Sequence, residues 1–342
     1  MSLLLLEGFD ALDSIHDKHQ ASSSNIEVDG TIKRTGTQSL KNTGSNTTYA
    51  YFPVTSTGLV NEVYLGFAFY MTVLPLLNGY SLVDFMGNNV RGSRININTD
   101  GSIHAYGAAD QEDSGANVLS VDTWYYIEIK MIKSDSSSAG DVIVMVDGVE
   151  WINCDAGKDF LSGSYAWTDQ IRFVGHSGNT RYIDDLYVCD ATGSKNNTFL
   201  GPIKIATLYS DGNGNDSDFV GSDADSIDNY LHVDDVTPDG DTTYVESNTA
   251  SEQDLYTFDD MPEASSEIIG IQVDSYIRKD APGARLGQHV TRVDGTDYVG
   301  TAFGVGLTYE YLSTIWEDNP DDAAAWEDAD IDAAEFGIKV QT

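Results

Sequence analysis

Short runs that alternate apolar and polar residues fill most of the first 190 residues, and Gly, Asn, Asp and Ser separate them. A two-residue period places apolar side chains on one face of a strand, so this pattern predicts an antiparallel β-sandwich. Residues 6–10 (Leu-Glu-Gly-Phe-Asp) and 182–188 (Tyr-Ile-Asp-Asp-Leu-Tyr-Val) bound the pattern. We expect these first and last strands to lie side by side and close a sheet.

The strands between these two ends are rich in β-branched and aromatic residues. They are expected at 63–73, 94–98, 102–106, 124–133, 141–146, 171–175 and 181–188. Asp100-Gly101 and Asp147-Gly148 predict hairpin turns, because Asp-Gly pairs readily adopt left-handed backbone conformations. No ten-residue stretch here has clear helical periodicity, so we expect the first domain to consist of strands.

A polar, turn-rich stretch at 190–201 predicts a boundary between a first domain at 1–195 and a second at 201–342. The net charge changes across this stretch, from −12 for residues 1–200 to −25 for the remainder. A length of 342 residues accommodates two domains, and the shift in composition favours that division.

The second domain is also expected to be rich in strands. Residues 268–278 and 298–309 have strong strand patterns and are predicted to be central strands of a second sheet. Apolar residues at helical spacing after Trp326 predict one short helix at about 327–334 that packs Trp326 down, followed by a last strand at 337–340. The fold class is therefore predicted to be all-β, with a short C-terminal helix.

Charge restricts the partners of this chain. It carries 55 acidic and 18 basic residues, a net charge of −37, which repels nucleic acids and anionic membranes. The apolar run at 1–6 is too short for a signal segment or a membrane span, so we expect synthesis in the cytoplasm and no membrane insertion. Cys154 and Cys189 are expected to be buried thiols, with a single disulfide as the alternative.

Several motifs of the first domain resemble concanavalin A-like, laminin-G-like jelly rolls. They are residues 8–10 (Gly-Phe-Asp), 122–128 (Asp-Thr-Trp-Tyr-Tyr-Ile-Glu), 146–149 (Val-Asp-Gly-Val) and 182–186 (Tyr-Ile-Asp-Asp-Leu). This resemblance implies a jelly-roll sandwich followed by a smaller β-sandwich. It does not specify a function, because this fold occurs in lectins, hydrolases and scaffolds alike.

The whole chain resembles virion structural proteins of tailed bacteriophages that begin with a jelly roll. The resemblance rests on residues 1–10, 200–209, 233–235, 241–245, 326–331 and 334–340. It implies a non-enzymatic protein of the virion exterior, in a tail, a fibre or a capsid decoration. Its implied partners are its own copies in a homo-oligomer such as a trimer, other virion proteins, and a host glycan or protein. A carbohydrate-active enzyme and a free soluble lectin remain the alternatives.

Hydrolytic chemistry has weak support in the sequence. A retaining glycosidase needs two carboxylates about 5 Å apart, and the Glu-x-Asp-x-x-Glu string of jelly-roll glucanases is absent. Glu128 and Glu150 stand alone in their strands. Residues 175–179 (Gly-His-Ser-Gly-Asn) have Asn179 where a nucleophile elbow requires glycine, so they predict a hairpin turn. We therefore expect no catalytic residues.

No cofactor is expected, and calcium is the alternative. Asp211, Asn213 and Asn215 have the oxygen side chains that a calcium loop uses at its first, third and fifth positions. The match then fails, since Asp216 replaces the glycine of such loops, so an ordinary turn is the alternative. The pair Asp184-Asp185 is expected to be structural, with one carboxylate bonded to the backbone of the first strand.

Aromatic side chains are the candidates for contact with a glycan or a protein partner. We select Tyr106, Trp151 and Trp167 from a larger set on loops and strand ends, which also contains Tyr49, Tyr51, Tyr80 and Tyr165. Exposed Tyr is as typical of protein interfaces as of lectins, so these residues do not separate the two kinds of ligand. Trp124 and Trp326 are predicted to be core anchors instead.

Overall fold

The computed structural model describes residues 2–54, 60–107, 111–115, 117–134, 136, 139–158, 160 and 165–341, with the backbone alone for residues 111 and 155–157. The chain divides into two compact units, Met1–Ile205 and Ala206–Thr342. Both units are built almost entirely from antiparallel strands, so the fold class is all-β as predicted. In the described part of the chain, no helix has the length and apolar character required to cross a membrane.

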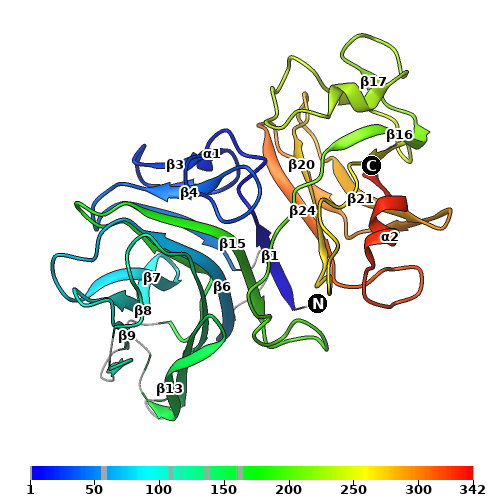
Figure 1. The fold of residues 1–342 in the computed structure, drawn as a ribbon. Coiled ribbons are helices and arrows are strands. Elements are labelled where there is room, and N and C mark those ends of the chain that lie inside the picture. Colours follow the sequence, from blue (N-terminus) through cyan, green and yellow to red (C-terminus); the bar gives the residue numbers. More distant parts are fainter. Residues whose placement is uncertain are drawn as a thin grey trace. The chain divides into compact units, whose positions relative to one another are not determined.

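The first unit is a jelly-roll sandwich of two sheets (Figure 1). One sheet has eight strands: β1 (Leu3–Glu7), β3 (Ile26–Asp29), β4 (Ser39–Asn42), β6 (Glu62–Met71), β11 (Tyr125–Ile132), β12 (Gly140–Val146), β13 (Val149–Lys158) and β15 (Arg181–Asp190). Its order is β13-β12-β11-β6-β15-β4-β3, and β1 pairs with β15. The predicted closure of the sheet by the first and last strands is therefore confirmed, with Leu6 opposite Tyr187.

The other sheet has seven strands in the order β10-β9-β8-β7-β14-β5-β2. They are β2 (Gln20–Ala21), β5 (Tyr49–Pro53), β7 (Tyr80–Gly87), β8 (Val90–Ile97), β9 (Ile103–Tyr106), β10 (Gln111–Asp113) and β14 (Gln170–Val174), and helix α1 (Ile15–Lys18) precedes β2. Aromatic rings fill the space between the sheets. Phe173 of β14 lies 4.8 Å from Phe67 of β6 and 5.6 Å from Phe52 of β5.

Both predicted Asp-Gly hairpins form. Gly101, between β8 and β9, has φ of 82°. Between β12 and β13, Asp147 and Gly148 have φ of 49° and 75°, as a two-residue turn with two left-handed positions requires. The predicted turn at 175–179 also forms, since His176 and Asn179 pair across it.

The Asp184-Asp185 pair marks the point where β15 changes its outer neighbour, from β4 to β1. Asp185 has φ of 47°, and both carboxylates are fully buried. Asp184 accepts a hydrogen bond from the Arg34 amide (2.7 Å), and Asp185 pairs with the Arg34 guanidinium (2.5 Å). The role is structural, but the partner is the turn at residues 34–35 and not the first strand.

Residues 199–205 belong to the first unit, whereas the sequence placed the end of that domain at 195. Their backbone N–H groups satisfy buried side chains: Gly201 donates to Glu128 (2.8 Å) and Ile205 to Asp185 (2.8 Å). The hydroxyl of Tyr187 also donates to Glu128 (2.6 Å). These bonds explain why the compact unit ends at residue 205 and not where the composition changes.

Trp124 is not a core anchor. It precedes β11, is half-buried, and its ring centroid lies 5.4 Å from that of Tyr70. The face of β11 that points between the sheets carries Ile127, which pairs with Phe67, so Trp124 and Tyr126 belong to the opposite face. Cys154 and Cys189 are buried thiols and not a disulfide, as expected.

The second unit contains a six-stranded sheet and two strand pairs. The sheet follows the order β16-β19-β25-β21-β22, with β23 also on β21, and consists of β16 (Ser210–Ser217), β19 (Gln253–Phe258), β25 (Glu335–Val340), β21 (Leu286–Val293), β22 (Thr296–Val299) and β23 (Phe303–Gly304). The pairs are β17 (Val220–Gly221) with β18 (Val245–Glu246), and β20 (Ile271–Ile277) with β24 (Glu310–Trp316). A 3-10 turn, η1 (Asn229–His232), and helix α2 (Asp328–Ala333) complete it.

The predicted short helix and its tryptophan are confirmed. Helix α2 begins after Glu327, which forms a reciprocal capping arrangement with Asp330. Trp326 is 2% exposed, packs in the core cluster with Phe336, and donates from Nε1 to the carbonyl of Trp316 (3.2 Å).

The predicted central strands of this unit are wrong. Residues 298–309 contain the end of β22 and the short β23, which both pair with β21 at the edge of the sheet and are separated by residues 300–302. Residues 268–278 contain β20, which pairs only with β24 among the described strands. The centre of the six-stranded sheet is β25, between β19 and β21.

Candidate functional site

The outer face of the seven-stranded sheet carries a row of polar and aromatic residues that crosses five strands. Register places them directly opposite one another in the order Tyr106 (β9), Arg94 (β8), Asp84 (β7), Arg172 (β14) and Tyr51 (β5). Side chains alternate between the two faces of a strand, so the residues before and after each of these in its strand point into the core. The row therefore belongs to the face that is turned away from the eight-stranded sheet.

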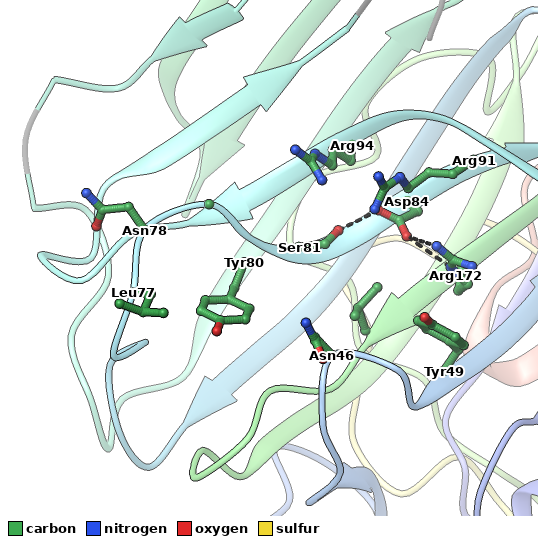
Figure 2. A pocket seen from close by; sticks show the side chains of 12 residues that line it. Asn46, Tyr49, Leu77, Asn78, Tyr80, Ser81, Asp84, Arg91, Arg94 and Arg172 are labelled. Atoms are coloured by element: carbon green, nitrogen blue, oxygen red, sulfur yellow. Dashed lines mark hydrogen bonds and ion pairs between the residues drawn. The ribbon is translucent and has the colours of Figure 1, made fainter. Parts of the chain in front are cut away.

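A hollow of about 210 Å³ lies over the centre of this row. Figure 2 shows Arg91, Arg94 and Arg172 gathered around Asp84, with Tyr80 farther along the hollow. The described residues that line it are Asn46, Tyr49, Leu77, Asn78, Gly79, Tyr80, Ser81, Asp84, Arg91, Arg94, Arg172 and Val174. Among them, Asp84 is the one carboxylate.

Asp84 is held at the base of the hollow. Only 1% of its surface is exposed, and its Oδ1 accepts a hydrogen bond from the Ser81 hydroxyl (2.5 Å). Its Oδ2 accepts from Nε of Arg172 (2.9 Å) and from Nη2 of the same guanidinium. Asp84 thus compensates the charge of Arg172 and fixes its orientation.

Two arginines of the hollow lie over tyrosine rings. The guanidinium carbon of Arg172 is 4.1 Å from the ring centroid of Tyr49, and that of Arg94 is 4.9 Å from the ring centroid of Tyr106. Such stacking restricts the motion of a long side chain and orders it before a ligand arrives. Burial, followed by the nearby charge of Arg91, lowers the pKa of Arg94 below its usual value.

A fourth arginine is buried beneath the hollow. Arg181 of β15 is 2% exposed, and its Nη1 donates to the carbonyls of Ser81 (2.7 Å) and Val174 (2.8 Å), two residues of the lining. Its Nε and Nη2 have no hydrogen-bond partner among the described residues. Burial lowers the pKa of Arg181 to about 10, so it remains a cation at neutral pH.

The electrostatics of this site oppose those of the rest of the protein. Three guanidinium groups and one carboxylate line the hollow and a fourth guanidinium lies beneath it, whereas residues 1–200 together carry a net charge of −12. In the part of the chain that the structure describes, Arg91 and Arg94 form no ion pair or hydrogen bond, and Arg94 is held by the Tyr106 ring and the nearby charge of Asp84. Their N–H groups are therefore available to an acceptor that enters the hollow.

The structure does not bring the three selected aromatic residues together. Tyr106 ends the row described above and packs on His104. Trp167 precedes β14 and meets Tyr165 edge to face at 4.7 Å. Trp151 belongs to β13 in the eight-stranded sheet, where it is 37% exposed. Tyr106 and Trp151 thus lie in different sheets.

Sequence reasoning missed the arginines of the hollow. The one local signal is the pair Arg91 and Arg94, two of 18 basic residues in a strongly acidic chain. Arg172 could not be linked to them, because strand register brings it there, and Arg181 reaches the underside of the hollow from the other sheet.

The predicted calcium loop is a strand. Asp211, Asn213 and Asn215 lie in β16, where extended backbone spreads alternate side chains along one face and does not curl them around an ion. Asp211 accepts from the Thr257 hydroxyl (2.6 Å), and Asn213 accepts from the Tyr230 amide (3.1 Å). In the described residues, no group of three or more His, Cys, Asp or Glu is arranged to hold a metal.

Comparisons with known proteins do not assign this chain to a family. No protein-family model matches the sequence, and no curated protein matches it. Among solved structures, the chain is similar to the cellulose-induced protein Cip1, with 13% identity and a TM-score of 0.38 over 50% of this chain and 90% of that one. It is also similar to alginate lyase Aly36B, with 11% identity and a TM-score of 0.38 over 54% and 96% of the two chains.

A Trypanosoma rangeli sialidase is similar over 50% of this chain and 27% of its own, with 15% identity and a TM-score of 0.35. This chain therefore spans about a quarter of the sialidase's length. At these identities and TM-scores, the similarities do not define a ligand or an activity.

Proposed function

We propose that this chain is a non-enzymatic glycan-binding protein of a phage exterior, and that its jelly roll binds a host surface glycan through the seven-stranded sheet. The observation that carries the binding role is the row from Tyr106 to Tyr51, which crosses the outer face of that sheet beneath an open hollow. Sugar binding needs aromatic rings and planar polar groups, and this row supplies both.

The chemistry of the row supports a saccharide ligand. Tyrosine rings offer apolar faces to the C–H groups of a sugar, and their hydroxyls supply hydrogen bonds at the rim. Guanidinium groups supply fixed donors for hydroxyl or carboxylate oxygens. Because Asp84 and Tyr49 already hold Arg172 in place, binding would order few additional side chains.

The number and bonding of the carboxylates in the hollow favour a role without catalysis. Glycoside hydrolysis uses two carboxylates, and Asp84 is the one carboxylate among the described residues of the lining. Its oxygens already accept from Arg172 and Ser81, which leaves it poorly placed as a nucleophile or general acid. A carbohydrate-active enzyme remains the alternative, and a free soluble lectin the second.

The virion assignment rests on the resemblance of the sequence to phage structural proteins. In this proposal the partners are other copies of the chain, in a homo-oligomer such as a trimer, and neighbouring virion proteins. The net charge of −37 suits a protein displayed in many copies on a particle, because like-charged copies repel one another and resist aggregation.

One experiment on the full chain tests the binding role. An immobilised array of bacterial and other surface glycans is probed with the wild-type protein, and every glycan that binds is then incubated with it and checked by mass spectrometry for cleavage. The proposal expects binding without cleavage. Cleavage would support the enzyme alternative, and a chain that binds no glycan would refute the binding role.

A second experiment tests the virion assignment. Particles from a phage genome that carries this gene are purified on a density gradient and their proteins identified by mass spectrometry. The chain is expected at a fixed copy number per particle. Its absence from intact particles, with monomeric protein in the lysate, would favour the free lectin.

A further inference from the structure

We propose that the hollow recognises the carboxylate of an acidic sugar residue, with Arg91 and Arg94 as the groups that contact it. This inference rests on the proposed glycan-binding function and names the class of glycan. A neutral sugar would need only hydroxyl and aromatic contacts, so the arginines are the feature that points to an acidic one.

Charge is the first support. Asp84 accepts two hydrogen bonds from Arg172, and its charge also acts on Arg94. In the described residues, neither Arg91 nor Arg94 forms an ion pair or a hydrogen bond with a carboxylate, so one carboxylate faces three guanidinium groups. Two neighbouring guanidinium groups repel each other unless an anion lies between or beside them. A ligand carboxylate would supply the missing acceptor, and guanidinium groups match carboxylates geometrically.

The buried arginine is the second and independent support. Arg181 lies under the lining, bonded to the carbonyls of Ser81 and Val174, and two of its nitrogens have no partner among the described residues. A buried cation without a carboxylate is costly, and proteins rarely retain one in a core without use. Here it adds positive potential below the place where the ligand carboxylate would sit.

The surroundings limit the size and kind of anion. The hollow of about 210 Å³ has room for little more than one sugar unit, and tyrosines 49, 80 and 106 lie in or beside it. Beyond it the chain is acidic, with −12 over residues 1–200, so a continuous polyanion such as nucleic acid would be repelled. A glycan with spaced carboxylates on uncharged rings fits both conditions.

The test uses the full chain and an array with three arms: carboxylated glycans (oligouronates and sialylated chains), sulfated glycans, and uncharged chains of equal length. Carboxylated glycans are expected to bind, and converting their carboxylates to methyl esters should weaken binding roughly tenfold or more, since bonds to charged groups are lost. Inorganic phosphate, measured alongside, should compete only weakly.

Matched variants locate the contact. Arg91→Gln and Arg94→Gln should each weaken binding of the best carboxylated glycan roughly tenfold or more, and Arg94→Lys should restore part of it. Lys33→Gln removes the same charge from the exposed loop between β3 and β4 of the other sheet and should leave binding unchanged. Melting curves of all variants confirm that each is folded.

The outcomes separate the two proposals. Binding of uncharged chains alone, or wild-type affinity in Arg91→Gln and Arg94→Gln, would overturn the acidic-sugar inference and leave the glycan-binding function in place. Binding of sulfated chains alone would overturn the carboxylate assignment. Absence of binding in all three arms would overturn both.

Discussion

At the scale of single residues, Asp84 determines how the hollow is organised. Its nearly buried carboxylate accepts from Arg172 and from the Ser81 hydroxyl. Asp84→Asn removes the charge that compensates Arg172 while preserving the shape of the side chain. We expect the free energy of unfolding to fall by about 1–3 kcal/mol, because a charge-assisted bond is lost. Urea denaturation measures it, and an unchanged midpoint would show that the pair contributes nothing.

His289 makes the second unit sensitive to acid. It is 1% exposed, lies 2.9 Å from the Ser275 hydroxyl and 2.8 Å from that of Thr314, and burial lowers its pKa to about 4. The unfolded chain binds a proton near pH 6.5 and the folded one only near pH 4, so the stability that this residue provides above pH 6.5 is lost as pH falls through that window.

The variant His289→Gln isolates this effect, since an amide can bond to both hydroxyls without titrating. Between pH 6.5 and pH 4, the wild type should lose on the order of 2–3 kcal/mol relative to the variant. Unfolding free energies at a series of pH values give the difference. Parallel curves for the two proteins would mean that His289 titrates normally in the folded state.

We expect Trp326 to contribute more to the stability of the second unit than any other single core residue. Its ring is 2% exposed and packs with Phe336 below helix α2. Trp326→Ala should cost about 3–5 kcal/mol through lost contacts and the cavity that remains. Trp124→Ala, a half-buried ring on the outer face, should cost much less. Equal losses in thermal melts would contradict the assignment of faces.

At the scale of elements, the segment 196–205 completes the jelly roll. The backbone N–H groups of Gly201 and Ile205 donate hydrogen bonds to the buried carboxylates of Glu128 and Asp185. A chain ending at residue 205 should therefore be more stable than one ending at 195 by at least about 2 kcal/mol. Chemical denaturation gives the free energy of unfolding of each truncated protein. Equal values would mean that the domain ends at residue 195.

The strands of the first unit follow closely from local sequence, and those of the second unit do not. In the first, alternation and Asp-Gly turns such as Asp147-Gly148 determine both element and register. In the second, the Gly- and Asn-rich residues 211–215 have the composition of a turn yet form β16, because β19 supplies a partner for their backbone. Long-range pairing overrides local preference there.

The candidate site shows the same limit. Tyr106 could be named from its residue type, and Arg94 is near it in sequence. Arg172 joins them only through the register of strands that are far apart in the chain, and Arg181 only because the eight-stranded sheet packs beneath the hollow. No pattern within one sequence contains that register, so the arginine cluster could be recognised only in the folded protein.

At the scale of the whole molecule, the acidic surface and the basic hollow respond to salt in opposite directions. A net charge of −37 destabilises the folded chain through self-repulsion, which salt screens. Raising NaCl from about 10 mM to about 500 mM should therefore raise the melting temperature while weakening the binding of a carboxylated glycan. Calorimetry provides both quantities, and a glycan affinity that does not change with salt would exclude charge as the basis of recognition.

The central claim is that the outer face of the seven-stranded sheet binds an acidic sugar in its arginine-lined hollow. A crystal structure of the full chain with the best-binding carboxylated glycan tests this directly. The account predicts the ligand carboxylate about 2.8 Å from the guanidinium nitrogens of Arg91 or Arg94, with a sugar ring beside Tyr80 or Tyr106. A ligand bound elsewhere, such as at Trp151 on the eight-stranded sheet, or one whose carboxylate points into solvent, would contradict it.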